Sequence, residues 1–561
     1  MKHLIIYTLS LVTLLSLCGC YADKGGNDFD TVLPDVEITI PEDAYSGSLG
    51  QTITVTPTIK SDIDNADLEY HWEVNGAVLN PETGREMFSP LVPDDQQAQT
   101  LTYTCHLDSS ITSLNKSYTC RLRVHQKSTG RDFYSASTFT ITIEGITGLM
   151  VLYGDDSQSD IGILQAEEFM PSSSSIPTEP SASTSLYSMN TGSKLQGKGQ
   201  RIVQATIESV EWYGDNVKDY CRILAMTDKA QQWLNRNDFS VYGDWNALFY
   251  LQGSRKVNAG DPRGYDMVGD WSIAFDGDDV FITSPTSAYQ YLFPMFTPQT
   301  ECKGGNKFTF APKMLKVGSS GIQKLMYATS VNGDKTRNGF VAITNGSTSN
   351  MNKYTELIDT KDDAATFNPG DMQASLVDWG VMSNKHAVAV MKGNSGRAKY
   401  AGQYFLADLL PSAKSGGASG YLNIPQHLYD LSALTNIASA TAFAFGSTQN
   451  MCYYATPGAV YRYGIDGTNA TAAAPIIMTD GTAVGLKGDV TMMKMLASPN
   501  TKTHNSDEIL LVATWDGSAS HLYALHLDNM TGNVTKVATY DAATVTGWAF
   551  GKIYDVNIKS L

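Results

Sequence analysis

The sequence is poor in basic residues, in cysteine and in recognisable catalytic motifs. Its 561 residues include 40 Lys and Arg against 57 Asp and Glu, which gives a net charge of −17. Such a chain lacks the basic footprint that nucleic-acid phosphates require. The seven Cys show no CxxC or Cys/His spacing, and neither HExxH nor GxSxG occurs. We therefore expect no nucleic-acid partner, no metal, no cofactor and no catalytic residue that a motif would identify.

Closely spaced carboxylates do occur at 276–279, where the sequence is DGDD. A calcium loop offers carboxylates at similar spacing, but the longer pattern of alternating acids that ends in Glu is missing. A two-residue hairpin turn explains the same residues, because glycine accepts a positive φ. We interpret the stretch as a turn.

A long apolar run is present only at the N-terminus. The run at 4–17 ends in LCGC, is short for a membrane span, and has a small residue before Cys20 that suits cleavage there. This ending resembles the bacterial lipobox, in which the Cys thiol is acylated. The resemblance implies a signal peptide at 1–19, lipidation of Cys20 and a flexible tether at 20–32. The alternative is an ordinary secretory signal with an accidental Cys.

Composition predicts an all-β protein of more than one domain. The chain has 29 Tyr, 19 Phe and 48 Gly, a combination typical of many short strands joined by tight turns. Its length is too great for a single core. We expect a β-sandwich at 33–146 and a repeat domain at 147–561.

The region 33–146 consists of short runs with alternating apolar residues, which predict an immunoglobulin-like sandwich. Trp72 lies in the middle of one run, where a sandwich needs a large inward ring. The runs are VEITI at Val36, TITVTPTI at Thr52, LEYHWEV at Leu68, LTYTCHL at Leu101, SYTCRLRV at Ser117 and STFTITIE at Ser137.

Two cysteines of this region, Cys105 and Cys120, lie on predicted strands. Each is two residues from apolar neighbours and so points to the same face of its strand as they do. An exported protein reaches an oxidising compartment, so the two can form a disulfide. The alternative is a pair of buried free thiols.

The region 147–561 repeats a hairpin pattern seven times. Its clearest copy, WSIAFDGDDVFITS at 271–284, is an alternating run, an Asp-Gly turn and a second β-rich run. Seven units give a period of roughly 59 residues, room for a four-stranded antiparallel sheet, and a ring of such sheets is a β-propeller. The strand at 553–558 is expected to close the ring by pairing near 150–153 or with the last unit.

The N-terminal third resembles the PKD-like lipoprotein family of Bacteroidetes. The likeness lies in the lipobox, the DKG tether, EYHWEVNG, the hairpin ending in KSTGRDFYSASTFTITIEG, and GLMVLYGD at Gly148. The resemblance implies a lipoprotein anchored in the outer membrane, facing the cell exterior. It also implies a place beside SusC/SusD-type uptake systems, with a TonB-dependent transporter and a SusD-like lipoprotein as partners.

Ligand candidates are aromatic residues on loops at a propeller mouth. Trp245 lies between Asp244 and Asn246, and Tyr289, Tyr291 and Phe293 lie in a proline-rich stretch. The alternative is that these rings are buried between or within the sheets. The longest segments between strand patterns are 165–200, 252–269 and 284–307.

Three functions remain open at this point. The leading hypothesis is a non-catalytic surface protein that binds a nutrient, either glycan or peptide, or a partner in an uptake complex. A second is a propeller hydrolase or lyase whose acid and base come from separate sheets. A third is a structural or adhesion protein that binds another protein through an exposed apolar face.

Overall fold

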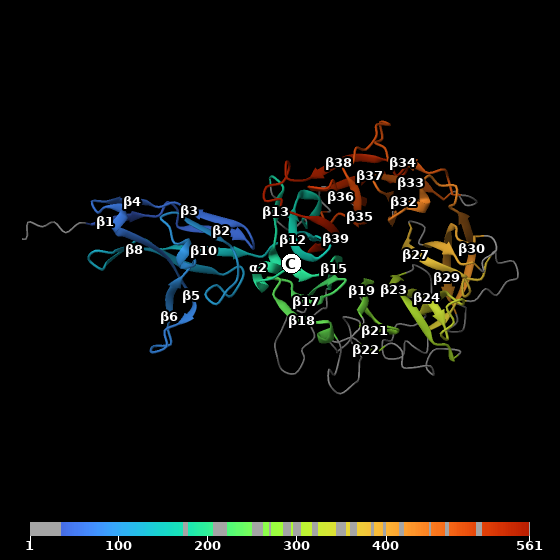
Figure 1. Ribbon diagram of the computed structural model, residues 1–561, viewed down its shortest axis with the longest axis horizontal. Helices are drawn as coiled ribbons and strands as arrows, with labels where there is room; N and C mark the ends of the chain where they lie inside the picture. Colours follow the sequence, from blue (N-terminus) through green and yellow to red (C-terminus); the bar gives the residue numbers. More distant parts are fainter. Residues whose placement is uncertain are drawn as a thin grey trace, which may run out of the picture.

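The protein is an all-β chain, as its composition predicts (Figure 1). The computed structural model describes residues 35–171, 178–205, 222–248, 262–268, 271–283, 293–294, 305–316, 324–343, 355–358, 367–382, 386–395, 400–413, 420–447, 450–465, 470–500 and 508–559. Cys20, the signal peptide and the tether lie outside these residues. No helix within the described ranges is long and apolar enough to span a bilayer.

The first ten strands form an immunoglobulin-like sandwich. One sheet has the order β2-β10-β8-β5-β6 with β9 beside β8, and the pairs β1-β4 and β3-β7 complete the fold. The strands are β1 (Val36–Thr39), β2 (Ala44–Ser48), β3 (Thr52–Val55), β4 (Thr58–Ser61), β5 (Leu68–Leu79), β6 (Glu86–Pro90), β7 (Leu101–Thr104), β8 (Ser117–Gln126), β9 (Arg131–Tyr134) and β10 (Phe139–Glu144).

All six predicted runs of this region form strands. The run at Thr52 is divided into β3 and β4 around Pro57, because proline has no N–H to give to a strand ladder. Single turns of 3-10 helix connect the strands at η1 (Asn65–Asp67) and η2 (Asp94–Gln96).

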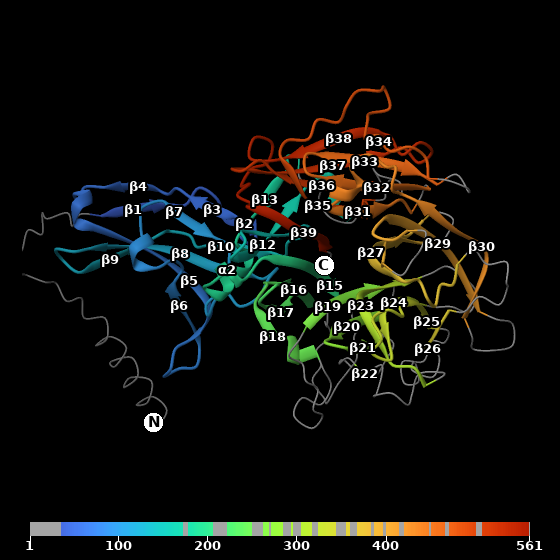
Figure 2. The same ribbon diagram turned by 45° about the vertical axis from the view of Figure 1, so that its right-hand side comes forward.

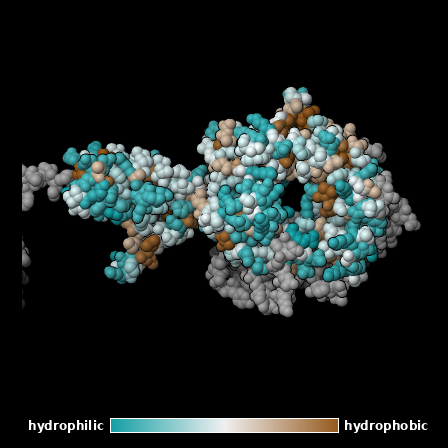
Figure 3. All heavy atoms as spheres, viewed as in Figure 1, coloured by the Kyte–Doolittle hydropathy of each residue, from teal (hydrophilic) through white to brown (hydrophobic). Residues whose placement is uncertain are grey.

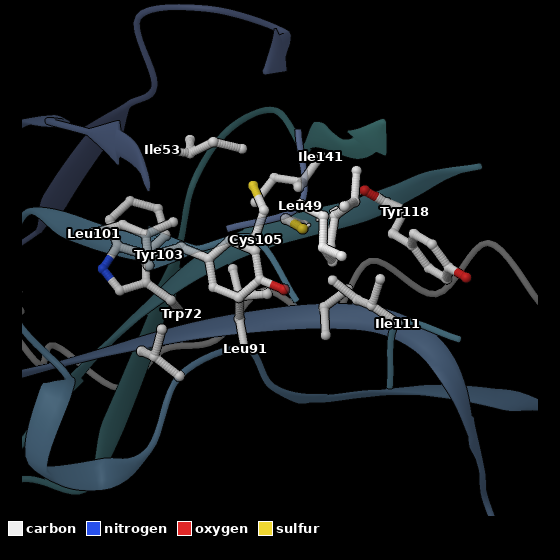
Figure 4. Close-up of a cluster of buried hydrophobic side chains, with 14 of the residues drawn as sticks. Leu49, Ile53, Trp72, Leu91, Leu101, Tyr103, Cys105, Ile111, Tyr118 and Ile141 are labelled. Atoms are coloured by element: carbon white, nitrogen blue, oxygen red, sulfur yellow. Dashed lines mark hydrogen bonds between the residues drawn. The ribbon is translucent and has the colours of Figure 1, made fainter. Parts of the chain in front are cut away.

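Trp72 is the centre of the sandwich core, as its position in the sequence predicts. Its ring is fully buried and meets Phe139 edge to face at 5.9 Å. The indole N–H donates to the Ala98 carbonyl at 2.8 Å, so the one polar atom of the ring is satisfied. Figure 4 shows Trp72 with Tyr103 and Leu91 in this cluster.

The two cysteines of the sandwich are free thiols rather than a disulfide. Cys105 and Cys120 are both fully buried in the same core. Burial disfavours the thiolate and raises the pKa of each thiol to about 12. The alternation of the strands correctly predicts that both side chains point into the core. A disulfide also requires a specific distance and orientation between the two Cβ atoms, which alternation does not determine. The alternative of two buried thiols is therefore the one that the structure contains.

Seven antiparallel sheets follow one another along the rest of the chain, six of four strands and the first of five. We number them one to seven. Sheet one contains β13 (Ser181–Ser183), β12 (Gln158–Gln165), β11 (Gly148–Gly154) and β39 (Lys552–Lys559), with β14 (Leu195–Gln196) beside β12. Sheet two contains β15 (Gly199–Ala205), β16 (Arg222–Thr227), β17 (Gln231–Asn235) and β18 (Val241–Asp244). Sheet three contains β19 (Pro262–Val268), β20 (Trp271–Asp276), β21 (Asp279–Thr283) and β22 (Phe293–Pro294).

The remaining sheets repeat the same antiparallel order. Sheet four contains β23 (Phe308–Lys316), β24 (Lys324–Val331), β25 (Gly339–Ile343) and β26 (Thr355–Leu357). Sheet five contains β27 (Ala374–Val381), β28 (Ala387–Gly393), β29 (Tyr404–Ala413) and β30 (Gly420–Asp430). Sheet six contains β31 (Ala442–Phe445), β32 (Met451–Thr456), β33 (Ala459–Gly464) and β34 (Ala474–Pro475). Sheet seven contains β35 (Asp489–Ala497), β36 (Glu508–Trp515), β37 (Ser520–Leu527) and β38 (Val534–Tyr540).

The C-terminal strand pairs with the first strand of the repeat region, as predicted. β39 lies antiparallel to β11, with Asn557 opposite Met150 and Asp555 opposite Leu152. The inner strands contact one another in the order β39, β15, β19, β23, β27, β31, β35 and again β39. In Figure 1 the sheets surround a common centre, and Figure 3 shows an opening there.

The hairpin at 271–283 has the predicted form. Asp276 pairs with Asp279, so Gly277 and Asp278 make the turn, and Gly277 has a φ of 52°. Glycine is favoured there because side chains resist positive φ. The DGDD stretch is therefore a turn, and the described residues contain no group of three His, Cys, Asp or Glu that could hold a metal.

The segment 165–200, expected to be a long loop, is partly ordered into elements. It contains η3 (Glu167–Phe169), β13, α2 (Leu186–Thr191) and β14. The sandwich packs on this segment: Leu186 and Tyr187 belong to the same buried cluster as Ile143 of β10. A Cβ on Gly50 would lie 2.7 Å from the Leu186 side chain. Figure 2 shows α2 at this junction of the two parts of the chain.

Candidate functional site

The inner strands of the sheets surround a central cavity of about 570 Å³. Its wall carries the ion-forming side chains Lys313, Asp378, Lys494 and Asp555 together with apolar groups. The further lining residues are Gln200, Arg201, Met314, Leu315, Gly380, Phe443, Ala444, Phe445, Met493 and Met495.

Two lysines of this cavity bind the neighbouring sheet in the same way. Lys313 Nζ donates to Asp378 Oδ1 and to the Trp379 carbonyl, both at 2.7 Å. Lys494 Nζ donates to Asp555 Oδ1 at 2.9 Å and to the Val556 carbonyl at 2.6 Å. We call these contacts the lysine clasps. Each joins the inner strand of one sheet to that of the next, so both carboxylates are neutralised by structural contacts.

Six of the seven inner strands contain an irregularity in their pairing with the second strand of the sheet. An extra residue bends the strand and changes the direction of nearby side chains. The single extra residues are Gln200, Arg263, Val377, Thr491 and Tyr554.

A second cavity of about 690 Å³ lies where sheets three, four and five meet. We call it the mouth pocket. Its lining is dominated by hydroxyl, amide and charged groups. The residues are Arg263, Asp278, Thr309, Tyr327, Thr329, Ser330, Gly333, Lys335, Asn338, Ala374, Ser375, Leu376 and Asn394.

Arg263 is held in the mouth pocket by the bulge of β19. Its guanidinium donates to the Gly277 carbonyl at 2.7 Å and to the Phe310 carbonyl, and it lies 3.9 Å from Asp278 Oδ1. The next residue, Gly264, leaves room for sheet four, because a Cβ there would lie 2.8 Å from Pro312. The cation is therefore fixed before any ligand arrives.

The floor of the mouth pocket is a buried hydrogen-bond network. The Tyr327 hydroxyl lies 3.0 Å from Asn338 Oδ1 and 2.5 Å from the Ala374 carbonyl. Asn338 Oδ1 also accepts from the Ala374 amide at 2.9 Å. Its Nδ2 donates to the Lys335 carbonyl at 3.3 Å. This network joins sheets four and five and sets the backbone that carries Lys335.

Trp245, the first of the predicted ligand residues, is buried between sheets two and three. Its ring is 4% exposed, and the indole N–H donates to Asp276 Oδ1 at 3.2 Å. It shares a cluster with Trp233 and Tyr265, whose rings meet edge to face at 5.2 Å. A ligand cannot reach a ring in that position, so the alternative of a packed Trp holds here.

The other predicted ligand residues are not placed as a group. Tyr289 and Tyr291 lie outside the described residues. Phe293 belongs to β22, where its backbone pairs with Ile282.

Sequence reasoning missed the mouth pocket because its residues come from separate sheets. Arg263, Lys335 and Asn394 are each isolated in the sequence and form no motif. The available signal was that Arg263 lies in the unusual segment 252–269. Arg263 was not predicted because only aromatic residues were considered as ligand candidates.

One family model matches the first part of the chain. A model of the PKD-like family matches residues 20–199, about a third of the chain, which confirms the PKD-like part of the resemblance for that stretch. The match covers the sandwich and continues into β15. No curated protein matches the chain.

Two solved structures show weak likeness. One is the extracellular domain of a protein classed as a one-component system of B. thetaiotaomicron, with 13% identity and a TM-score of 0.29 over 69% of this chain. This chain spans 40% of that structure's length. The other is a polysaccharide lyase, with 12% identity and a TM-score of 0.27 over 88% of this chain and 98% of the lyase.

Proposed function

We propose that this protein is a lipid-anchored cell-surface protein that binds a nutrient, a glycan or a peptide, for a TonB-dependent uptake complex. In this proposal Cys20 carries the lipid, the sandwich at 33–146 is a spacer, and 147–561 is a seven-bladed β-propeller that binds the ligand. A SusC-type transporter and a SusD-like lipoprotein are the proposed partners. The PKD-like match at 20–199 supports the family on which the proposal draws.

The propeller assignment is supported by sheet number, order and closure. Seven sheets, each with a four-stranded order, follow in sequence, with β14 as a fifth strand beside the first, and the last strand supplies the inner strand of the first sheet. Each inner strand also contacts that of the next sheet. A ring of this kind leaves only short, protected sheet edges and presents its loops at two mouths.

The observation that carries the binding role is the mouth pocket. It is a preformed cavity with polar side chains converging from three sheets, and convergent polar groups in a preformed cavity are a feature of small-ligand sites. The carboxylates of the central cavity, Asp378 and Asp555, are instead occupied by the lysine clasps. That favours binding over a hydrolase or lyase, which needs a carboxyl free to transfer a proton.

A protein partner is supported by a separate feature, the hairpin of β5 and β6. Leu79 is 55% exposed and Met87 is 39% exposed. Figure 3 shows apolar surface on this projecting hairpin. Exposed apolar residues of this kind often mark a protein contact, and we assign them to the uptake complex.

Anchoring is tested by labelling cells that express the full chain with radioactive palmitate. We expect label on the protein, and loss of label and of membrane association in Cys20→Ala. Protease added to intact cells should degrade the wild-type protein if it faces outward. An unlabelled protein, or one shielded from protease, would contradict the anchor or the orientation.

Partnership and binding are tested separately. Mild detergent extraction followed by affinity capture should recover an outer-membrane transporter and a second lipoprotein, and capture of neither would contradict the uptake role. A screen of the chain from Tyr21 onward against glycans and oligopeptides should give binding to one class. The absence of binding to both would contradict the nutrient-binding role.

A further inference from the structure

The mouth pocket has a charge and hydrogen-bonding pattern that indicates its ligand class. We infer that it binds an acidic glycan, an oligosaccharide that carries carboxylate or sulfate groups. The inference rests on the proposed function and narrows it to one ligand class. It is carried by two cations, a group of hydroxyl and amide side chains, and the position of the pocket's aromatic ring.

The cations are Arg263 and Lys335. Arg263 is preset by its two carbonyl contacts and is only 27% exposed, so a ligand group bound to it is partly desolvated. Lys335 is exposed and makes no ion pair with any described residue. Charge-assisted hydrogen bonds from such groups to a carboxylate or sulfate are stronger than neutral ones. In a chain of net charge −17, Arg263 and Lys335 against the one carboxylate of Asp278 leave this lining with a net positive charge, which favours anions.

The remaining lining suits sugar hydroxyls. Thr309, Thr329, Ser375 and Asn394 line the cavity with hydroxyl and amide groups. The Thr329 hydroxyl donates to the Thr309 carbonyl at 3.1 Å and the Ser375 hydroxyl to Asn394 Oδ1 at 3.4 Å, so these two hydroxyls offer a ligand acceptor positions. Asp278 is 65% exposed at the rim and accepts hydrogen bonds only. Adjacent hydroxyls of a sugar ring need such alternating donors and acceptors.

A neutral glycan held by stacking fits this pocket poorly. Tyr327 is the aromatic residue of the described lining, and it is fully buried beneath the floor. A peptide is also less suited, because extended peptides bind by adding to an open strand edge. Among the strands of the described lining, β24 is paired on both sides, and the edge strands β19, β23 and β27 lie against the neighbouring inner strands.

The test uses the chain from Tyr21 onward on an array of uronate-containing, sulfated and neutral glycans together with oligopeptides. Affinity for the best acidic glycan is then measured by calorimetry beside its carboxyl-reduced or desulfated counterpart. We expect binding to acidic glycans, and at least about tenfold weaker binding after removal of the acidic groups. The carboxylate and sulfate arms of the array show which anion is used.

Variants locate the site. Lys335→Gln removes an exposed charge that supports no contact in the fold and should weaken binding about tenfold or more. Arg263→Gln with Lys335→Gln should abolish it. Arg85→Gln with Lys127→Gln is the matched control, since it removes two exposed charges from the sandwich and should leave affinity unchanged.

The outcomes separate the two proposals. Binding to neutral glycans or peptides that Lys335→Gln leaves intact overturns the acidic-glycan inference and keeps the nutrient-binding role. If the control Arg85→Gln with Lys127→Gln loses as much affinity as the pocket variants, the inference is also overturned. That result would show that the glycan is attracted by any positive charge on the protein. The absence of binding to any glycan or peptide overturns both.

Discussion

Glu168 is a buried carboxylate at the contact between the first and last sheets. It lies in η3 and is 3% exposed. Oε1 lies 3.3 Å from His526 Nε2 and 3.3 Å from Lys536 Nζ, and the Tyr540 hydroxyl donates to Oε2. The adjoining carbonyls accept from Ser498 and Asn500. Five side chains, three from strands of sheet seven and two from the segment that follows β35, thus secure the segment that follows β12.

The charge of Glu168 makes this contact sensitive to acid. Burial raises the pKa of the carboxyl, but hydrogen bonds from His526 and Tyr540 outweigh burial and hold the pKa well below its usual range. A carboxyl with a lowered folded-state pKa stabilises the fold above its unfolded-state pKa, which is about 4.3. That contribution is lost as the pH falls towards the folded-state pKa.

We predict that Glu168→Gln lowers the free energy of unfolding by about 3 kcal/mol at pH 7. The reason is that His526 and Tyr540 then lose the carboxylate to which they hydrogen-bond. The difference from wild type should shrink between pH 5 and pH 3, where the wild-type carboxylate loses its advantage. Urea unfolding at pH 7, 5 and 3 measures both effects.

Glu167→Gln is the matched control for that experiment, because it makes the same change one residue away. It should leave both stability and its pH dependence close to wild type. A Glu168→Gln protein that loses stability in acid as steeply as wild type would contradict the assignment.

The free thiols of the sandwich give a second prediction at this scale. Because Cys105 and Cys120 are fully buried with pKa values raised to about 12, neither should react with a thiol reagent at pH 8 in the native protein. In urea without reductant both should react, which peptide mass mapping detects. Failure of both to react in urea would show that a disulfide links them.

Single residues were predicted well where parity alone decides burial, and poorly where a neighbouring sheet decides it. Trp72 and the two cysteines follow the alternation of their own strands. Trp245 follows a strand in the sequence and resembles a loop residue, but sheet three covers its ring and Asp276 binds its N–H. No local pattern contains that neighbour.

At the scale of elements, the lysine clasps explain how adjacent sheets are held in register. Lys494 and Asp555 belong to neighbouring inner strands, and Asp555 also accepts from the Ile202 amide of the next sheet at 2.9 Å. One carboxylate therefore connects sheets seven, one and two. The bulges of the inner strands bend these strands and change the direction of nearby side chains.

A double-mutant cycle tests the clasp. Lys494→Met and Asp555→Asn should show a coupling free energy of about 1–2 kcal/mol, as expected for a charge-assisted bond of a largely buried carboxylate. The measurement is urea unfolding of the two single variants and the double variant.

The pair Lys60 and Glu37 is the control for the cycle. Its separation is 3.0 Å, close to that of the clasp, but its side chains are 71% and 64% exposed. Solvent screening should hold its coupling below about 0.5 kcal/mol. Equal coupling in the two pairs would mean that the clasp contributes no more than a surface ion pair.

Elements themselves were the most predictable level. The hairpin at 271–283 and the six sandwich runs follow from alternation and turn chemistry, which act over a few residues. The content of 165–200 was missed because β13 and β14 are only three and two residues long. Strands that short are stabilised by β12 rather than by their own sequence.

At the scale of the whole molecule, repetition in the sequence was enough to predict seven units and a closing strand. The number of units follows from the spacing of similar hairpins. The predicted strand at 553–558 has no hairpin partner of its own, so it needs a strand from elsewhere in the chain. The mouth pocket could not be predicted in this way. Its chemistry depends on which side chains of three sheets face one space, and the packing of the sheets decides that.

The closed ring is the central claim, and native-state hydrogen exchange tests it most directly. A C-terminal strand ordinarily frays, but β39 supplies the inner strand of sheet one. We predict that amides of 552–559 and 148–154 exchange as slowly as those of β36 and open together with them. Rapid exchange of 552–559 while β11 and β12 stay protected would contradict closure of the ring.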